Sequence, residues 1–267
     1  MIDLVLLFLT AVALAYTGLV VLAVWIAPKM IFPVPARGRK GIPDAFRIVI
    51  PSGIAIAARY LPRHDADRLF LYHHGNAEDL SDLDACLDAF HDHGFAVLAY
   101  DYPGYGSSEG VPSARLVIEA AEAVLAYAQK ELGWPLPKII SYGRSLGGGP
   151  SLALAAKYPL AGAVTEATFT STFRVITRWR LLPWDVFDNL ALIRRAQCPL
   201  LLIHGRKDMT VPFSHAQQLL AAAPAGTQHL WIDQANHIDI VAVGDEAYWR
   251  ALEAFAARRS LPHITQI

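Results

Sequence analysis

The chain has 267 residues, of which 54% are hydrophobic and 18% charged, and its formal net charge is −1. This apolar content suffices for one large core, and the balanced charge argues against a nucleic-acid partner, which would require a basic surface. Cys86 and Cys198 are expected to be small buried hydrophobes rather than a disulfide. His91 and His93 have no third ligand at a suitable spacing, so we expect no metal site.

The N-terminal segment differs from the rest because positions 4 to 27 carry no charge and are mainly apolar. A helix of this length reaches about 36 Å, enough to cross the roughly 30 Å hydrocarbon core of a membrane. We therefore predict a membrane anchor over residues 1–28 and a linker over 29–44. A signal peptide cleaved near Ala13-Leu14-Ala15 is the alternative, although no Lys or Arg precedes the apolar run.

The charges that flank this segment predict its orientation. Lys29, Arg37, Arg39 and Lys40 follow the span, whereas only Asp3 and the terminal amine precede it. Positive charge is retained on the cytoplasmic side of membranes. The sequence thus predicts a single-pass membrane protein whose main domain lies in the cytoplasm.

That domain, residues 45–267, begins with two strand-like segments, 47–50 and 54–60, which read as an antiparallel hairpin around Pro51-Ser52-Gly53. Strand and helix patterns then alternate. Strand-like runs occupy 69–73, 95–100, 138–142, 162–165, 199–205 and 229–233, and helix-like runs occupy 79–91, 113–132 and 151–156. This alternation predicts an α/β fold with a mostly parallel central sheet and helices on both faces.

A candidate nucleophile follows the strand 138–142, in the segment Gly143-Arg144-Ser145-Leu146-Gly147. This segment fits G-x-S-x-G, in which glycines at both ends allow a sharp turn from strand to helix that exposes the serine hydroxyl. Leu146 then opens a helix, and its backbone N–H can point at the oxygen that becomes negative when an acyl group is attacked. Ser145 is therefore the candidate nucleophile.

A serine hydroxyl needs a histidine to accept its proton and a carboxylate to orient that histidine. Asp208 lies in the loop after the strand 199–205, and His237 follows the strand 229–233. Three strand ends thus each carry one member of a Ser, Asp and His set, at the sheet edge where open α/β sheets place their chemistry. Glu166, at the end of the strand 162–165, is the competing acid, and we favour Asp208.

An earlier strand, 69–73, runs into His74-Gly75-Asn76. A glycine at 75 permits a tight turn over the nucleophile, so the Asn76 backbone N–H is the candidate second donor of an oxyanion hole. The alternative is an ordinary turn that contains a glycine.

These segments resemble the α/β-hydrolase superfamily and, within it, the membrane-anchored α/β-hydrolase domain-containing proteins of the bud-emergence type. The resemblance also rests on the run from Tyr100 to Gly110 and covers roughly residues 45 to 260. It implies Ser145 as nucleophile, Asp208 as acid, His237 as base, and the backbones of Asn76 and Leu146 as oxyanion hole. Relatives hydrolyse carboxylic esters or thioesters, and some remove acyl chains from proteins.

The expected function is therefore that of a serine hydrolase that acts on a small-molecule or lipid-like acyl substrate through an acyl-enzyme, with no cofactor. Two alternatives stay open. One is a serine peptidase of the prolyl-oligopeptidase type, although the chain lacks the length for the large propeller of that group. The other is a membrane-tethered scaffold that retains the fold without catalysis. The natural substrate and the oligomeric state are not specified by the sequence.

The segment of about 168–197 lies where this superfamily inserts a cap over the active site. It combines aromatic side chains with Arg174, Arg178 and Arg180. This composition suggests an acyl-chain groove that faces an anionic membrane surface, or else rings that simply pack the cap onto the sheet. The candidate groove residues are Phe169, Phe173, Trp179 and Trp184.

Overall fold

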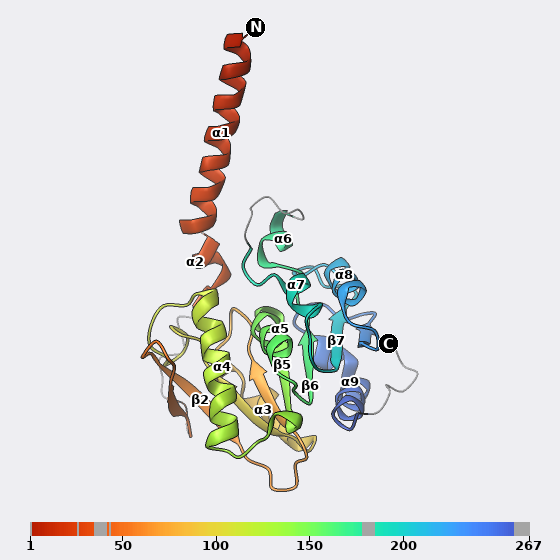
Figure 1. Ribbon diagram of the computed structural model, residues 1–267. Coiled ribbons are helices and arrows are strands. Elements are labelled where there is room, and N and C mark those ends of the chain that lie inside the picture. Colours follow the sequence, from red (N-terminus) through yellow and green to blue (C-terminus); the bar gives the residue numbers. More distant parts are fainter. Residues whose placement is uncertain (1, 26, 35–41, 43, 178–184, 259–267) are drawn as a thin grey trace.

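The computed structural model describes residues 2–25, 27–34, 42, 44–177 and 185–258. Its centre is a sheet of eight strands in the order β1-β2-β4-β3-β5-β6-β7-β8 (Figure 1). β2 pairs antiparallel with β1 and with β4, and every other pairing is parallel, as the alternating pattern predicted. The strands are β1 (Phe46–Val49), β2 (Ala55–Leu61), β3 (Leu69–His73), β4 (Ala96–Tyr100), β5 (Ile139–Arg144), β6 (Gly162–Glu166), β7 (Leu200–Gly205) and β8 (Gln228–Ile232).

Helices cover both faces of this sheet, because side chains of successive strand residues point to opposite sides. In β3, Phe70 and Tyr72 join a core cluster with α3 and α9, whereas Leu69 and Leu71 join the cluster that includes α4. Figure 1 shows α4 and α5 in front of the sheet. The α-helices are α1 (Ile2–Trp25), α2 (Ala27–Ile31), α3 (Asp84–Asp92), α4 (Ala114–Lys130), α5 (Gly148–Lys157), α6 (Thr172–Thr177), α7 (Asn189–Ile193), α8 (Ser214–Ala222) and α9 (Ile240–Ala256), and the 3₁₀ turns are η1 (Leu80–Asp82), η2 (Leu136–Lys138) and η3 (Ser145–Gly147).

The helix expected over 79–91 is divided into η1 and α3. Asp79 caps η1, since its carboxylate accepts a hydrogen bond from the Ser81 backbone N–H at 2.9 Å. The preceding N–H, of Leu80, donates instead to the Asp101 side chain at 2.8 Å. This tertiary contact, which helical periodicity cannot reveal, ties the start of η1 to the end of β4.

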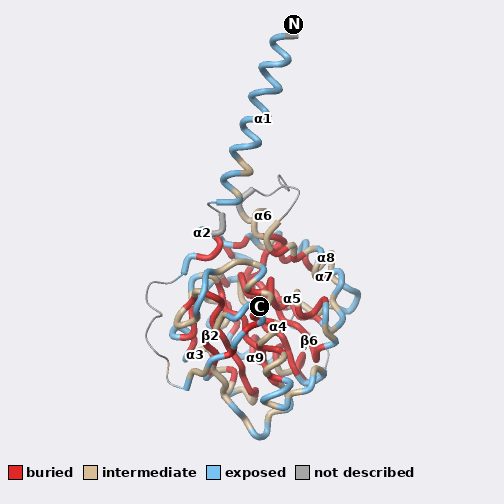
Figure 2. The backbone as a smooth tube through the Cα atoms, turned by 60° about the vertical axis from the view of Figure 1, so that its left-hand side comes forward, coloured by how far each residue is buried: buried red, intermediate tan, exposed pale blue. Residues whose placement is uncertain are grey.

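The anchor segment forms a helix that stands clear of the domain (Figures 1 and 2). The most apolar 18-residue stretch within Asp3–Trp25 has a mean hydropathy of 2.5 and no buried residues, so α1 is long and apolar enough to span a membrane. Figures 1 and 2 agree that α1 leaves the domain at the same end as α6.

Part of the predicted linker, 29–44, packs against the domain. Ile31 and Phe32 are 7% and 5% exposed, and the Phe32 ring lies 6.4 Å from the ring of Phe187. Phe187 belongs to the predicted cap and in turn contacts the start of α5, where a Cβ on Gly149 would lie 2.6 Å from its ring. Apolar burial thus begins before residue 45, and the segment that follows the anchor packs against the cap.

Candidate active site

The candidate nucleophile lies in a sharp turn between β5 and α5. Ser145 has a φ of +51°, a left-handed conformation that an L-residue adopts only when its surroundings enforce it. A Cβ on Gly143 would lie 2.1 Å from the Gly147 carbonyl oxygen, and one on Gly147 would lie 2.0 Å from the His73 carbonyl oxygen. Both positions therefore require glycine, as the motif predicted, because backbone crosses backbone at this turn.

The structure brings Ser145, His237 and Asp208 together from the ends of β5, β8 and β7. The His237 Nε2 atom lies 3.1 Å from the Ser145 Oγ, and its Nδ1 atom lies 2.7 Å from an Asp208 carboxylate oxygen. Asp208 is 4% exposed, and the His237 side chain is 13% exposed. This geometry suits proton transfer from the serine hydroxyl to an imidazole that is oriented by a buried carboxylate.

The second oxygen of Asp208 is fixed by its own loop. It accepts hydrogen bonds from the backbone N–H groups of Thr210, at 2.8 Å, and Val211, at 2.7 Å. His204, at the end of β7, donates from Nε2 to the Val211 carbonyl at 2.9 Å. Burial lowers the pKa of His204, so its ring is neutral and serves this loop as a hydrogen-bond donor.

Glu166, the competing acid, has a different set of partners. It is 2% exposed, and one carboxylate oxygen accepts hydrogen bonds from the hydroxyls of Tyr142 at 2.5 Å and Tyr248 at 2.8 Å. Its other oxygen lies 3.3 Å from the Arg144 Nε atom. Among the described residues, the carboxylate hydrogen-bonded to His237 is that of Asp208.

The loop that carries the candidate oxyanion donor is held by aromatic hydroxyls. Tyr102 donates to the His74 carbonyl at 2.6 Å, and Tyr105 donates to the Asn76 carbonyl at 2.9 Å. No described residue accepts a hydrogen bond from the Asn76 backbone N–H. With its carbonyl engaged and its N–H without a partner among the described residues, Asn76 is suited to bind an anionic oxygen.

An ion pair joins this loop to the turn of the nucleophile. Glu78 accepts a hydrogen bond from the Gly75 N–H at 2.8 Å and receives the Arg144 guanidinium at 3.0 Å. Arg144 directly precedes Ser145, so the pair connects both sides of the candidate oxyanion hole. The roles of Glu78, Tyr102 and Tyr105 could not be read from the sequence, although the two tyrosines lie within the segment on which the resemblance rests.

The candidate cap residues fall into three groups. Phe169 is 5% exposed and belongs to the core cluster under α4, which favours packing for that ring. Phe173 is half-buried at the edge of the same cluster, in α6. Trp179 and Trp184 lie outside the described residues. A role for these side chains in an acyl groove stays a prediction.

An eight-stranded sheet of this order, with a serine in a tight turn after β5, is the architecture of the α/β hydrolases. Residues 68–183 match the family model described as "alpha/beta hydrolase fold". The human α/β-hydrolase domain-containing protein 17B is 30% identical over 197 residues, which cover 73% of this chain and 68% of the relative. The chain belongs to the α/β-hydrolase superfamily.

Another relative, the α/β-hydrolase domain-containing protein aho-3 of Caenorhabditis elegans, is 35% identical over 173 residues. The aligned part is 64% of this chain and 52% of that protein, so the chain spans about half the length of this relative. The narrower resemblance to the bud-emergence type stays a prediction.

Solved structures of similar fold include an esterase of Pyrococcus furiosus, with a TM-score of 0.69 and 16% identity over 85% of this chain and 99% of that one. The esterase domain of a Rhodothermus marinus protein has a TM-score of 0.62 and 24% identity over 80% of this chain and 97% of that one. At these identities the likeness establishes the fold.

Proposed function

We propose that this protein is a serine hydrolase that cleaves carboxylic esters or thioesters through an acyl-enzyme. The proposal is carried by one observation, the chain of contacts from Ser145 Oγ to His237 at 3.1 Å and from His237 to Asp208 at 2.7 Å. It is supported by the strained turn that presents Ser145, which superfamily members use to expose a nucleophile.

In the proposed mechanism, His237 removes the proton from Ser145 as the serine oxygen attacks the substrate carbonyl. Asp208 orients the imidazole and stabilises the imidazolium that forms. The backbone N–H groups of Asn76 and Leu146 bind the oxygen that becomes negative in the tetrahedral intermediate. His237 then gives its proton to the leaving group, and water hydrolyses the acyl-enzyme by the same steps in reverse order. These residues need no cofactor for these reaction steps.

A fluorophosphonate probe tests the proposal, because it labels a serine only when that serine is activated. We expect the full chain in detergent to be labelled and Ser145→Ala to abolish labelling. Ser52→Ala, at an exposed turn, is the control and should label like the wild type. Folded wild-type protein that fails to label, or a Ser145→Ala variant that labels equally, would favour the non-catalytic scaffold instead.

We also infer that α1 anchors the protein in a membrane as a single span, with the hydrolase domain on the cytoplasmic side. The inference is supported by the length and hydropathy of α1 and by the basic residues that follow it, of which Lys29 lies in α2. The location of α6 at the end of the domain from which α1 leaves agrees with an acyl substrate that arrives from the membrane. Protease protection in sealed vesicles tests the orientation.

A further inference from the structure

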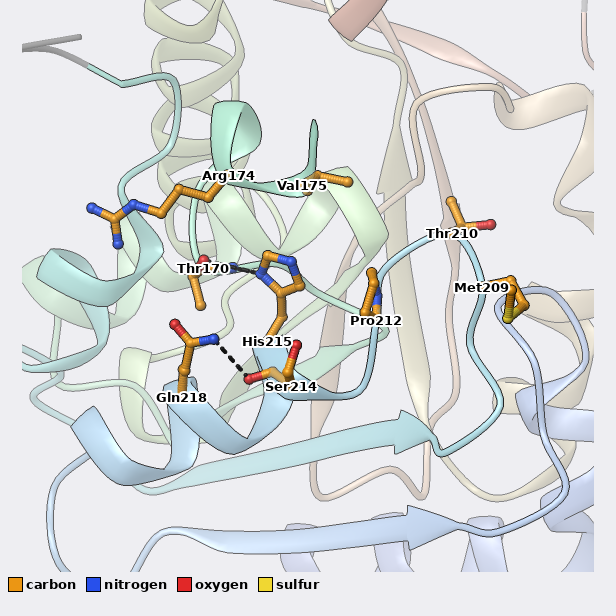
Figure 3. Close-up of a pocket in the computed structure, with 9 residues that line it drawn as sticks. All are labelled: Thr170, Arg174, Val175, Met209, Thr210, Pro212, Ser214, His215 and Gln218. Carbon is orange, nitrogen blue, oxygen red and sulfur yellow. Dashed lines mark hydrogen bonds between the residues drawn. The ribbon is translucent and has the colours of Figure 1, made fainter. Parts of the chain in front are cut away.

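The cap region contains a cavity of about 560 Å³ between α6, the loop after β7 and the start of α8 (Figure 3). Its wall adjoins the candidate triad on two sides. Met209 and Thr210 directly follow Asp208, and the Thr210 N–H donates to the Asp208 carboxylate. On the other side, Thr170 lies two residues beyond Thr168, whose hydroxyl donates to the Ser145 carbonyl at 3.1 Å. The cavity is therefore lined by residues close in sequence to groups that contact Ser145 and Asp208, although neither Ser145 nor His237 lines it.

Arg174 gives the cavity a positive charge that the described part of the protein does not neutralise. No ion pair joins its guanidinium to any described residue, and its Nε atom is buried without a hydrogen-bond partner. No Asp or Glu is among the residues that line the cavity. Figure 3 shows the Arg174 side chain extending from α6, on the opposite side of the view from Met209 and Thr210. A partly desolvated cation of this kind is stabilised when an anion binds beside it.

His215 adds a neutral hydrogen-bond donor at the centre of the cavity. It is 7% exposed, and its Nδ1 atom accepts from the Thr170 backbone N–H at 3.3 Å. Because Nδ1 is an acceptor and burial lowers the pKa of this histidine, the ring is neutral and its hydrogen is on Nε2. That nitrogen has no partner among the described residues and lies on the side of the ring away from Thr170 (Figure 3).

Two hydroxyl groups and a helix terminus complete a set made up mainly of donors. Thr210 and Ser214 line the cavity, and α8 begins at Ser214 without a side-chain cap on its first turn. Hydroxyls, an imidazole N–H, a guanidinium and the N-terminal end of a helix all favour a negatively charged oxygen. The wall suits an anion better than an acyl chain, because polar groups form the larger part of its surface.

We propose that this cavity binds an anionic group of the substrate, a carboxylate or a phosphate, that lies apart from the reacting carbonyl. This inference rests on the proposed function, since it names the substrate class of the same hydrolase site. It predicts esters or thioesters that carry a negative charge on the acyl or the leaving side. Arg174 is then a specificity residue rather than a member of the catalytic set.

The test compares matched esters that differ only in charge. On the acyl side, these are the mono-4-nitrophenyl esters of succinic and adipic acid, their methyl-capped diesters, and a phosphonate analogue. On the leaving side, they are 4-carboxyphenyl acetate, 4-phosphonophenyl acetate and the methyl ester of the former. We expect Arg174→Gln to lower kcat/KM at least 10-fold for one anionic set and less than 2-fold for its neutral partners. Comparing variant with wild type cancels the intrinsic reactivity of each ester.

Two controls isolate the charge. Arg174→Lys keeps the cation and should retain most of the preference, and Arg250→Gln, which alters an exposed arginine paired with Glu246, should leave all rates unchanged. The carboxylate and phosphonate arms show which of the two anions fits. If Arg174→Gln changes anionic and neutral esters by the same factor in both sets, the proposed anion site is overturned.

A readout without turnover separates this inference from the proposed function. We expect inorganic phosphate or succinate, at constant ionic strength, to raise the Tm of Ser145→Ala protein and to raise it less in Ser145→Ala/Arg174→Gln. If the wild type hydrolyses no ester, the proposed function fails and this shift alone decides the site. Equal shifts in both proteins would overturn the anion site even in an active hydrolase.

Discussion

Two cavities lie beside the candidate triad, and each is lined by one arginine. The two arginines differ in whether they form ion pairs with described residues. A largely apolar cavity of about 320 Å³ lies beside Ile238, the neighbour of His237, and its Arg144 is paired with Glu78 and Glu166. The cavity of about 560 Å³ beside Met209 holds Arg174, which has no ion pair with any described residue. A cation in internal ion pairs stabilises the fold, whereas a cation without such partners is available to a ligand.

The tyrosine hydroxyls around the paired Glu166 also retain their protons. Burial raises the pKa of Tyr142 and of Tyr248 well above the usual value for tyrosine, so both hydroxyls remain hydrogen-bond donors to Glu166. The carboxylate therefore has its partners without His237. This arrangement explains why a buried acid at the end of β6, which was the main competitor in the sequence, is structural in our interpretation.

The largest expected effect separates the two acids. Asp208→Asn should lower kcat for a nitrophenyl ester by about 10⁴-fold, because an amide in that position favours the wrong imidazole tautomer. Glu166→Gln should keep kcat within about 10-fold, since it removes a charge from the paired network and leaves His237 oriented. Steady-state kinetics of both variants check this comparison. A larger loss in Glu166→Gln would reassign the acid.

The second-largest effect should be a loss of stability when the ion pair between Arg144 and Glu166 is broken. Arg144→Met leaves Glu166 buried without its cation, which should lower the free energy of unfolding by about 3 kcal/mol. Urea denaturation of the full chain in detergent measures it. Adding Glu166→Gln to the same protein should restore part of the loss, because the buried charge is then removed as well. The exposed Arg250→Met is the matched control, and a loss no larger than its own would show that the network contributes little.

A smaller effect should come from the loop that carries Asn76. Glu78→Gln weakens the contact that holds Gly75, so the Asn76 N–H is less well placed for the developing oxyanion. We expect kcat to fall by about 10-fold with KM nearly unchanged, because the lost interaction belongs to the transition state. Glu122→Gln, which breaks a surface pair with Lys157, should leave both constants unaltered. A rise in KM alone would place Glu78 in substrate binding instead.

The alternation of strands and helices along the chain, and the three polar side chains at strand ends, could be read from the sequence. Each depends on a short segment whose pattern is local: alternating elements, a glycine-flanked serine, and a polar residue after a buried strand. Contacts between distant segments could not be read in this way. The Glu78 and Arg144 pair joins positions 66 apart, and no periodicity marks either residue.

The buried face of a helix was also predicted only in part. The helical spacing of Leu116, Ala120, Val124 and Tyr127 predicts that these four residues form the inward stripe of the helix over 113–132. The structure buries Ala120 and Val124 but leaves Leu116 and Tyr127 partly exposed, and it buries Val117 fully. The small side chains of α4 pack closely on the sheet, so the buried face follows the fit to β1–β4 rather than the size of the apolar residue.

The last prediction concerns Asp101, a buried carboxyl, and it is a change in how stability depends on pH. One of its oxygens accepts from Leu80 N–H, and the other has no partner among the described residues. Burial, with Asp79 and Asp82 nearby, raises its pKa from 3.8 to about 7. Between these values the folded protein keeps a proton that the unfolded chain releases. Stability should therefore fall as pH rises through that window, by up to about 1.4 kcal/mol per unit, and level off above it.

Asp101→Asn should flatten this slope, because the amide keeps the Leu80 contact and has no proton to lose. Urea unfolding between pH 5 and 8 measures the difference from the wild type. His74, whose Nε2 atom lies 3.8 Å from Asp101, has a pKa lowered by burial and so destabilises the fold as pH falls below 6.5. Its effect has the opposite sign and is present in both proteins, so the difference between them reports Asp101 together with its coupling to His74. Identical slopes in the two proteins would mean that this carboxyl is already ionised in the native fold at neutral pH.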